Sequence, residues 1–448
     1  MATNVTNRNR QPKGTSKGGQ FAPETHATAP ADLDNSSDKP SVVEYYPNGS
    51  PRLEEWRNSD GKIHRENGPA RVRYRENGTI DYEEWWKDGE LCRDNEPACT
   101  YYYPDGAIEE EEWYQSQGAH RIDGPAFIKY YEDGTIKYED WRLDDKRHRL
   151  DGPEYVEYYP DGTPKTEEWW QDGQHHRTDG PATIDYREDG TIESEEWYTN
   201  GKLDRTDGPA TITYFQNGTT KTESWYKNGQ PHRDNGPAIT NYREDGSIER
   251  EEWWQDGQHH RTDGPATIDY REDGTVYREI WRKNGKWCRE NGPATIDYYE
   301  NGTIESELWC KNEKRHRDDG PAYITYFQNA TTKTQSWWKN GQPHRTDGPA
   351  YTGYDSDGTL QFEEWLQGGQ RHRVDGPAYV SYNPDGAIER EEWWKSDRLH
   401  RTDGPAVIRY DENGNIVSEQ WWQNGEKTPH PQTSQPSEKE PRNGHQHH

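Results

Sequence analysis

Histidine stands directly before arginine at ten places in this chain, and imidazole recurring at a regular spacing is first of all a candidate metal ligand. The ten are His64, His120, His148, His176, His232, His260, His316, His344, His372 and His400, and Cys92, Asp204 and Cys288 take the same position three further times. If each repeat adds two or three strands at about 4.8 Å, successive positions lie on the order of 10 Å or more apart. One zinc ion needs its ligands at about 2 Å. We therefore predict no metal site and no cofactor. We expect the imidazoles to pack or hydrogen-bond beside aromatic residues.

Carboxylates and guanidinium groups recur in the same way. Glu lies two residues before a regularly spaced Trp in thirteen of fourteen cases, with Gln335 as the exception, and an Arg series runs unbroken from Arg65 to Arg401. General acid or base catalysis needs paired groups in one pocket, and no single repeat stands out. A three-residue loop after the Trp would place Glu83 across from Arg93 and Glu167 across from Arg177, as a ladder of structural pairs. We predict no catalytic residue, and no G-x-S-x-G, P-loop, HExxH or CxxC motif is present.

Aromatic side chains form two further series. Trp85, Trp113, Trp141, Trp169 and Trp197 belong to an uninterrupted Trp series, and Tyr74 and Tyr186 belong to a Tyr series. A second Trp follows the regular one at Trp86, Trp170, Trp254, Trp338, Trp394 and Trp422. Consecutive residues of a strand point to opposite faces, so one row is expected in the core and the other on the surface. The second row is therefore the candidate binding surface, for protein or sugar.

The elements that position these residues follow from the period. The Pro of the phrase Asp-Gly-Pro-Ala and its variants recurs every 28 residues from Pro69 to Pro405, in thirteen repeats after a half repeat that begins near Val42. Such a period is typical of repeat proteins whose units stack on one another. Turns of the x-Asp-Gly or x-Asn-Gly type separate short runs rich in Thr, Ile, Tyr and Trp, and no helical periodicity is present. We predict an all-β fold, an elongated single-layer antiparallel sheet or open solenoid of about thirteen β-hairpin repeats, spanning residues 41–426 between disordered segments 1–40 and 427–448.

Composition limits the class of function. The chain has 448 residues, of which 27% are hydrophobic and 31% charged, with 21 Trp, 30 Tyr and a net charge of −29. Such acidity argues against nucleic acid or an anionic membrane as partner and permits a basic protein. Four cysteines and the lack of a long apolar stretch indicate a reduced, cytoplasmic protein without a membrane span.

The repeat resembles a known family. The sequence Tyr-Pro-Asp-Gly, then Glu-Trp, Lys-Asp-Gly and His, is similar to the MORN repeat, in particular to its bacterial variant in YwqK-type antitoxins. The resemblance covers residues 42 to about 426. It departs from the family in the length of 28 residues and in having His-Arg-x-Asp-Gly-Pro-Ala where the family commonly has His-Gly-x-Gly. It implies a twisted antiparallel sheet of hairpins and a scaffold or toxin-neutralising role.

Repeated copies of whole segments favour binding over catalysis. Residues 169–191 and 253–275 have the same sequence, and such copying preserves a distributed surface but would scramble a unique active site. We therefore expect a non-enzymatic scaffold that binds a protein, of basic character, as an antitoxin or immunity-type partner. One alternative is a carbohydrate or cell-wall binding array on a phage or cell surface. Another is an acidic mimic of nucleic acid that inhibits a DNA-binding protein. The sequence does not identify the partner or the oligomeric state.

Overall fold

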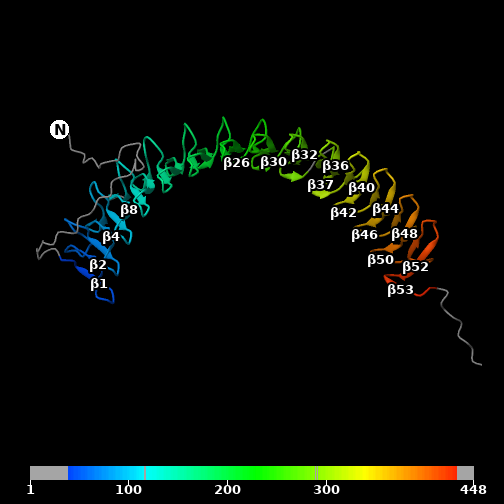
Figure 1. Cartoon of the computed structure of the whole chain (residues 1–448), viewed down its shortest axis with the longest axis horizontal. Helices are drawn as coiled ribbons and strands as arrows, with labels where there is room; N and C mark the ends of the chain where they lie inside the picture. Colours follow the sequence, from blue (N-terminus) through cyan, green and yellow to red (C-terminus); the bar gives the residue numbers. More distant parts are fainter. Residues whose placement is uncertain (1–38, 116–117, 288, 290, 431–448) are drawn as a thin grey trace, which may run out of the picture. The chain divides into compact units, whose positions relative to one another are not determined.

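The predicted all-β architecture is confirmed. The structure, a computed structural model, describes residues 39–115, 118–287, 289 and 291–430. These residues form 53 strands, 29 of them in an antiparallel sheet and the others in two-stranded mini-hairpins (Figure 1). The described ranges contain no helix long and apolar enough to cross a membrane. The predicted disorder of 1–40 and 427–448 falls almost wholly outside the described residues, although β53 (Glu426–Thr428) extends two residues past the expected end of the array.

The chain divides into two compact units, of residues 1–232 with 242–246 and of residues 233–241 with 247–448. The sheet strands of the first are β1 (Val42–Tyr45), β2 (Pro51–Glu55), β3 (Arg71–Tyr74), β4 (Ile80–Glu84), β7 (Cys99–Tyr102), β8 (Ile108–Glu112), β11 (Phe127–Tyr130), β12 (Ile136–Asp140), β15 (Tyr155–Tyr158), β16 (Pro164–Glu168), β19 (Thr183–Tyr186), β20 (Ile192–Glu196), β23 (Thr211–Tyr214) and β24 (Thr220–Ser224). Its mini-hairpins are β5 (Trp86–Lys87) with β6 (Glu90–Leu91), β9 (Tyr114–Gln115) with β10 (Gly118–Ala119), β13 (Arg142–Leu143) with β14 (Lys146–Arg147), β17 (Trp170–Gln171) with β18 (Gln174–His175), β21 (Tyr198–Thr199) with β22 (Lys202–Leu203), and β25 (Tyr226–Lys227) with β26 (Gln230–Pro231).

The second compact unit repeats the same elements, and β27 (Ile239–Tyr242) contains residues of both units. Its sheet strands are β28 (Ile248–Glu252), β31 (Thr267–Tyr270), β32 (Val276–Ile280), β35 (Thr295–Tyr298), β36 (Ile304–Leu308), β39 (Tyr323–Tyr326), β40 (Thr332–Ser336), β43 (Tyr351–Tyr354), β44 (Leu360–Glu364), β47 (Tyr379–Tyr382), β48 (Ile388–Glu392), β51 (Val407–Tyr410), β52 (Ile416–Gln423) and β53. Its mini-hairpins are β29 (Trp254–Gln255) with β30 (Gln258–His259), β33 (Arg282–Lys283) with β34 (Lys286–Trp287), β37 (Cys310–Lys311) with β38 (Lys314–Arg315), β41 (Trp338–Lys339) with β42 (Gln342–Pro343), β45 (Leu366–Gln367) with β46 (Gln370–Arg371), and β49 (Trp394–Lys395) with β50 (Arg398–Leu399).

One repeat, Trp169–Glu196, illustrates the order of elements: a mini-hairpin, a corner loop that holds the Gly-Pro-Ala sequence, and a sheet hairpin. The sheet hairpins close with the predicted three-residue loop and bulge. In the β15–β16 hairpin the register shifts at Tyr158, and the amide of Gly162 bonds the Tyr159 carbonyl at 2.9 Å. Gly162 takes a positive φ of 84°, which glycine adopts at no steric cost.

The mini-hairpins differ from the prediction. Trp170 pairs with His175 and Gln171 with Gln174, so the turn has two residues, Asp172 and Gly173, both at positive φ. This is the type I′ turn that Asp-Gly and Asn-Gly favour because its twist matches that of the strands. The three-residue loop that we predicted after the Trp was wrong.

The predicted pairing of Glu with Arg was wrong for the same reason. Glu167 lies between Val156 and Ile184 in the sheet, and its carboxylate accepts a hydrogen bond from the Tyr186 hydroxyl at 2.8 Å. Glu83 likewise accepts from the Tyr102 hydroxyl at 2.9 Å. The same Tyr–Glu bond, at most 3.2 Å long, recurs in twelve places, among them Tyr74 with Glu54.

The arginines stack on the regular tryptophans instead. The guanidinium carbon of Arg177 lies 4.0 Å from the Trp169 ring centroid, and that of Arg93 lies 3.7 Å from Trp85. At least twelve such pairs lie within the described residues, including Arg121 with Trp113, Arg149 with Trp141 and Arg205 with Trp197. A guanidinium over an indole face is held by cation–π attraction, which strengthens as water is excluded. The ladder residues therefore contact one another within the array, but with other partners than we predicted.

The corner loop explains the recurrent Gly-Pro-Ala. Arg177 donates from Nη1 to the Pro181 carbonyl at 3.3 Å, and a Cβ at Gly180 would lie 2.8 Å from the guanidinium carbon. Ala182 is fully buried; its amide bonds the Glu196 carbonyl and its carbonyl accepts from the Trp169 amide. Glycine therefore leaves room for the guanidinium and alanine fits between the two strands, although Glu96 replaces the glycine in one repeat and Glu154 replaces the alanine in another.

We predict that replacing Arg177 by Ala lowers the local opening free energy of its repeat by about 1–3 kcal/mol, because a cation–π contact and a hydrogen bond are lost. Native-state hydrogen exchange at the Ala182 amide measures this. Arg177→Lys should recover only part of the loss, because an ammonium group lacks the planar stacking surface. Glu167→Gln should cost less than about 0.5 kcal/mol, because Gln also accepts the Tyr186 hydroxyl. A coupling energy of Arg177 with Glu167 that exceeds its coupling with Trp169 would contradict this assignment.

Candidate functional site

The histidines before the arginines link neighbouring repeats through the backbone. Nδ1 of His316 accepts the Asn340 amide at 3.0 Å, and Nδ1 of His400 accepts the Asn424 amide at 3.1 Å. Asp204, which stands in the same position, accepts the Asn228 amide with its carboxylate at 3.2 Å. The position therefore selects a hydrogen-bond acceptor. Within the described residues no group of three or more His, Cys, Asp and Glu side chains is placed to hold a metal ion.

A second link runs along the loops of the sheet hairpins. The Tyr159 hydroxyl donates to the carbonyl of Tyr186 at 2.8 Å, one repeat further on. Arg187 takes the place of this tyrosine in the next repeat, and its Nη2 donates to the carbonyl of Tyr214. Tyrosine and arginine can both make this link because each reaches a backbone carbonyl about 27 residues ahead with a terminal donor. Other repeats have Phe, Asp or Asn at this position, at Phe215, Phe327, Asp355, Asn383 and Asp411.

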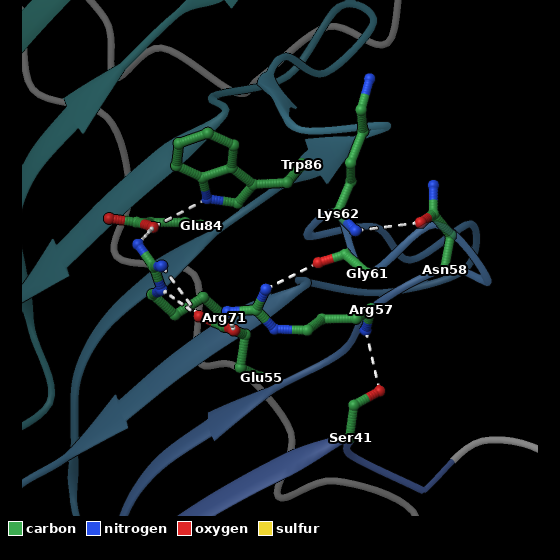
Figure 2. Close-up of polar contacts among 9 residues, drawn as sticks. All are labelled: Ser41, Glu55, Arg57, Asn58, Gly61, Lys62, Arg71, Glu84 and Trp86. Atoms are coloured by element: carbon green, nitrogen blue, oxygen red, sulfur yellow. Dashed lines mark hydrogen bonds and ion pairs between the residues drawn. The ribbon is translucent and has the colours of Figure 1, made fainter.

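The second Trp row is not the freely exposed surface that we expected. Its six members, Trp86, Trp170, Trp254, Trp338, Trp394 and Trp422, are all half-buried. Each indole N–H bonds a side chain two residues earlier, as Trp86 does with Glu84 at 2.7 Å and Trp338 with Ser336 at 2.8 Å. Figure 2 shows Arg71 reaching from this Glu84 to Glu55 of the preceding strand. The row thus anchors the mini-hairpins to the sheet.

Two histidines that directly precede members of the regular His series lie against this row. His175 packs on Trp170 with ring centroids 3.9 Å apart, and His259 packs on Trp254 at 3.6 Å. Burial lowers the pKa of His259 to about 4, so the ring is neutral at physiological pH. The signal in the sequence was the doubled His, which within the repeats occurs at these two places.

Exposed acidic residues gather at the loops of the sheet hairpins. We call this set the hairpin-edge carboxylates: Glu132, Asp133, Asp161, Glu188, Asp189, Glu272, Asp273 and Asp357. Asp189 accepts hydrogen bonds from the amide and hydroxyl of Thr191, at 2.9 and 2.6 Å, and these bonds hold its pKa below the ordinary value. Asp133, Asp161 and Asp273 have the same partners and the same shift. The aspartates of this edge stay ionised even in mild acid.

The aspartates of the corner loops are different, because an arginine neutralises them. Asp179 lies 2.9 Å from Nε of Arg177, and Asp207 lies 3.1 Å from Nε of Arg205. None of the hairpin-edge carboxylates has an ion pair within the part of the chain that the structure describes. The edge of sheet-hairpin loops therefore carries the uncompensated negative charge.

One interface between repeats is irregular. Glu154 stands where the other twelve repeats have a fully buried Ala, and it is only 6% exposed. Its carboxylate accepts the Trp170 amide at 2.8 Å, and burial raises its pKa. A groove of about 730 Å³ opens beside it, lined among others by Arg147, Trp170 and His176. A groove of about 550 Å³ occupies the equivalent place between His372 and Trp394, so the feature is a widened version of a repeated one.

Comparison with known proteins identifies no family. No family model matches the chain, and no curated protein matches it. The crystal structure of TcdB2-TccC3 is 11% identical over 86% of this chain and 25% of its own, with a TM-score of 0.13. Choline binding protein F from Streptococcus pneumoniae, in the presence of a peptidoglycan analogue, is 15% identical over 75% of this chain and 91% of its own, with a TM-score of 0.15. This chain thus spans a quarter of the TcdB2-TccC3 chain, and TM-scores this low support no transfer of function.

Replacing Asp204 by Ala should open the link to the next repeat, because the Asn228 amide loses its acceptor. We expect that amide to exchange with solvent about 5- to 10-fold faster, as a loss of about 1 kcal/mol requires. Asp204→His should restore the native rate, since His fills this position elsewhere. The Asn200 amide, which bonds His176, serves as the internal control. Equal acceleration at both amides would show a general loosening and contradict a local link.

Replacing Glu154 by Ala should stabilise its repeat by about 1–2 kcal/mol near neutral pH, because a buried carboxylate is removed. The raised pKa means that the folded chain holds the proton more tightly than the unfolded chain does. Stability is therefore lost as the pH rises through the folded pKa, and the advantage of Glu154→Ala should shrink as the pH falls toward about 4. Hydrogen exchange of the Trp141 amide, which bonds the backbone carbonyl of residue 154 in both proteins, measures this at both pH values.

The reverse change at the regular position, Ala182→Glu, is the matched control and should destabilise its repeat near neutral pH. A loss of stability in Glu154→Ala near neutral pH would show that the hydrogen bonds to the carboxylate outweigh its burial.

Proposed function

We propose that this protein is a non-catalytic cytoplasmic repeat scaffold that binds a basic protein through its hairpin-edge carboxylates, as an antitoxin or immunity-type partner. The observation that carries the proposal is the recurrence of exposed, ionised and unpaired carboxylates at the same loop of successive repeats. A row of like charges attracts an oppositely charged surface over a long front and speeds its encounter. The resemblance to bacterial MORN-repeat variants is in keeping with this role.

Many other recurring polar side chains are already bonded or stacked within the array, and this supports the hairpin-edge carboxylates as the binding surface. The corner arginines stack on Trp, the tyrosines bond Glu, and the histidines hold backbone amides. These contacts recur from repeat to repeat, so they maintain the array. A distributed surface of this kind suits a partner that contacts several repeats at once, whereas a catalytic centre needs one distinct constellation.

Crowding of carboxylates also favours a cationic partner. On β8, burial and the neighbouring Glu110 raise the pKa of Glu112 to about 7, with Glu84 on β4, two strands away, adding to the effect. A group in this state is partly protonated near neutral pH because burial, and after it the negative charge nearby, disfavours the ionised form. A bound cationic surface would relieve this repulsion and favour the ionised form.

The test neutralises four hairpin-edge carboxylates in Glu132→Gln, Asp133→Asn, Glu188→Gln and Asp189→Asn combined. Asn occurs naturally at this loop position, as in Asn217 and Asn301, so the fold should tolerate the change. The matched control removes the same charge from the corners, in Asp123→Asn, Asp151→Asn, Asp179→Asn and Asp207→Asn, where Asn also occurs naturally at Asn67 and Asn95.

Each protein is immobilised and incubated with lysate of its host at low and at raised salt, and retained proteins are identified by mass spectrometry. We expect the native chain and the corner control to retain a stoichiometric basic protein. The hairpin-edge variant should bind that protein at least about tenfold more weakly, and raised salt should weaken the binding of the native chain in the same way, because salt screens a charge-driven contact. Equal retention by both variants would contradict the proposed surface.

The same experiment separates the two alternatives. Retention on cell-wall polysaccharide in place of a protein would favour the carbohydrate-binding array. Release of the captured protein by competing DNA would favour the acidic mimic of nucleic acid.

A further inference from the structure

The two outermost strands of the sheet present the two halves of the contact that joins neighbouring repeats. Between β48 and β51 that contact pairs Glu391 with Ile408 and Glu392 with Val407. It is completed by the Tyr410 hydroxyl, which donates to Glu391 at 2.7 Å, and by the Trp393 amide, which donates to Ala406. Strand pairing, a Tyr–Glu bond and a Trp–Ala bond thus define one repeat-to-repeat interface.

At the N-terminal edge the first half of this interface is unfilled. Among the described residues β1 pairs with β2 alone. Tyr45 occupies the position of Tyr410, yet it is 63% exposed, and its hydroxyl has no partner in the part of the chain that the structure describes. In twelve other places that hydroxyl position is bonded to the Glu of the preceding repeat, and no described strand stands in that place beside β1.

At the C-terminal edge the other half is unfilled. The segment 416–420 of β52 pairs with β51 on one side only. Glu419 occupies the position of Glu391 and is exposed, and no tyrosine within the described residues reaches it. Ile416 and Val417 are 53% and 61% exposed. The edge thus offers an acceptor for a tyrosine hydroxyl and an apolar surface that a following repeat would cover.

The composition of this edge does not protect it from pairing. At the position of Val417 the other thirteen sheet hairpins have a charged residue in eleven cases, as in Lys165, Glu193 and Glu389, and the two exceptions are Tyr277 and Gln361. Natural proteins usually protect an exposed edge strand with charge, proline or a bulge. A valine in place of the usual charged residue leaves the edge open to strand addition.

We propose that two copies of this chain associate end to end, with β52 of one copy pairing antiparallel with β1 of the next. Continuing the register of the inner repeats places Ser418 opposite Glu44 of the second copy, and Glu419 opposite its Val43. The Tyr45 hydroxyl of the second copy donates to Glu419. The contact is heterologous, so it leaves one free edge at each end and extends to a third copy. This inference does not rest on the proposed function.

The primary test is sedimentation of the full chain over a range of concentrations. We expect the average mass to rise continuously past that of a dimer. The rise should be greater at about 0.5 M salt, where charge repulsion between the acidic copies is screened, than at low salt. Binding of a basic partner should weaken as salt is raised, whereas self-association should strengthen. The two experiments therefore show separately whether the proposed function or the end-to-end contact fails. A monomer at every concentration and salt would overturn this proposal.

Two lysine substitutions localise the contact. Val417→Lys places a charge on the β52 edge and should leave the chain monomeric. Val374→Lys, at a corner-loop valine that is 84% exposed and not on an edge, is the matched control and should assemble as the native chain does. Both valines are exposed, so neither change should disturb folding. Equal assembly by the two variants would overturn the assignment to this edge.

A mixture of two variants, each with one cysteine added to the four native ones, tests the register. Ser418→Cys in one preparation and Glu44→Cys in another should form an intermolecular disulfide on mild oxidation, since directly opposed residues have Cβ atoms about 4.5–5.5 Å apart. Ser418→Cys mixed with Glu76→Cys, an exposed position on a hairpin loop, is the control. Peptide mass spectrometry identifies the linked residues. Linkage in the control mixture at an equal yield would reject the register.

Discussion

The stacking of an arginine on a tryptophan, in all repeats but that of Glu96 above a glycine that makes room for it, is the contact on which the array depends. The guanidinium of Arg177 covers Trp169 and bonds the Pro181 carbonyl, and a side chain at position 180 would collide with it. The loop that is held in this way inserts Ala182 between two strands of the sheet. A chain with 27% hydrophobic residues cannot build thick aliphatic cores, and this arrangement replaces them with a planar cation, an indole and backbone hydrogen bonds.

Some links between repeats are made by more than one type of side chain. His316 and Asp204 serve as acceptors for the same backbone amide, and Tyr159 and Arg187 serve as donors to the same carbonyl. Each position therefore tolerates residues that differ in size and charge. Because all four links involve backbone groups of the next repeat, copying a whole repeat carries its links with it, which is consistent with the identical sequences at 169–191 and 253–275.

The sequence was sufficient to predict what local chemistry decides. The period, the β class and the three-residue loop at Gly162 follow from spacing and from turn residues. The partners of Glu167 and Arg177 did not follow, because a change of one residue in loop length turns every side chain to the other face. The constant recurrence of Glu and Arg was compatible with both loop lengths, and the Asp-Gly turn preference at Asp172 was the better guide.

The candidate site was predicted less well for a related reason. The second Trp row was expected to be exposed, yet Trp86 is held by Glu84, a contact that depends on how the mini-hairpin folds back over the sheet. The buried Glu154 was visible only as a departure from Ala at one position among thirteen, and its effect on the adjacent groove needs three-dimensional neighbours. The hairpin-edge carboxylates could be recognised in the sequence as acidic turns. Their lack of ion pairs could not be predicted from the sequence.

The succession of hairpins also has a mechanical consequence. Each sheet strand pairs with the strand before it and the strand after it in the chain, as β15, β16 and β19 do. Tension applied to the two ends of such a chain peels an edge strand away from its neighbour. The hydrogen bonds of that strand then break one after another, whereas in shear they would resist together. The array should therefore yield at low force, one repeat at a time, with each step releasing about 100 Å of chain for a repeat of 28 residues. A protein built in this way can lengthen under load and recover without losing the order of its remaining repeats.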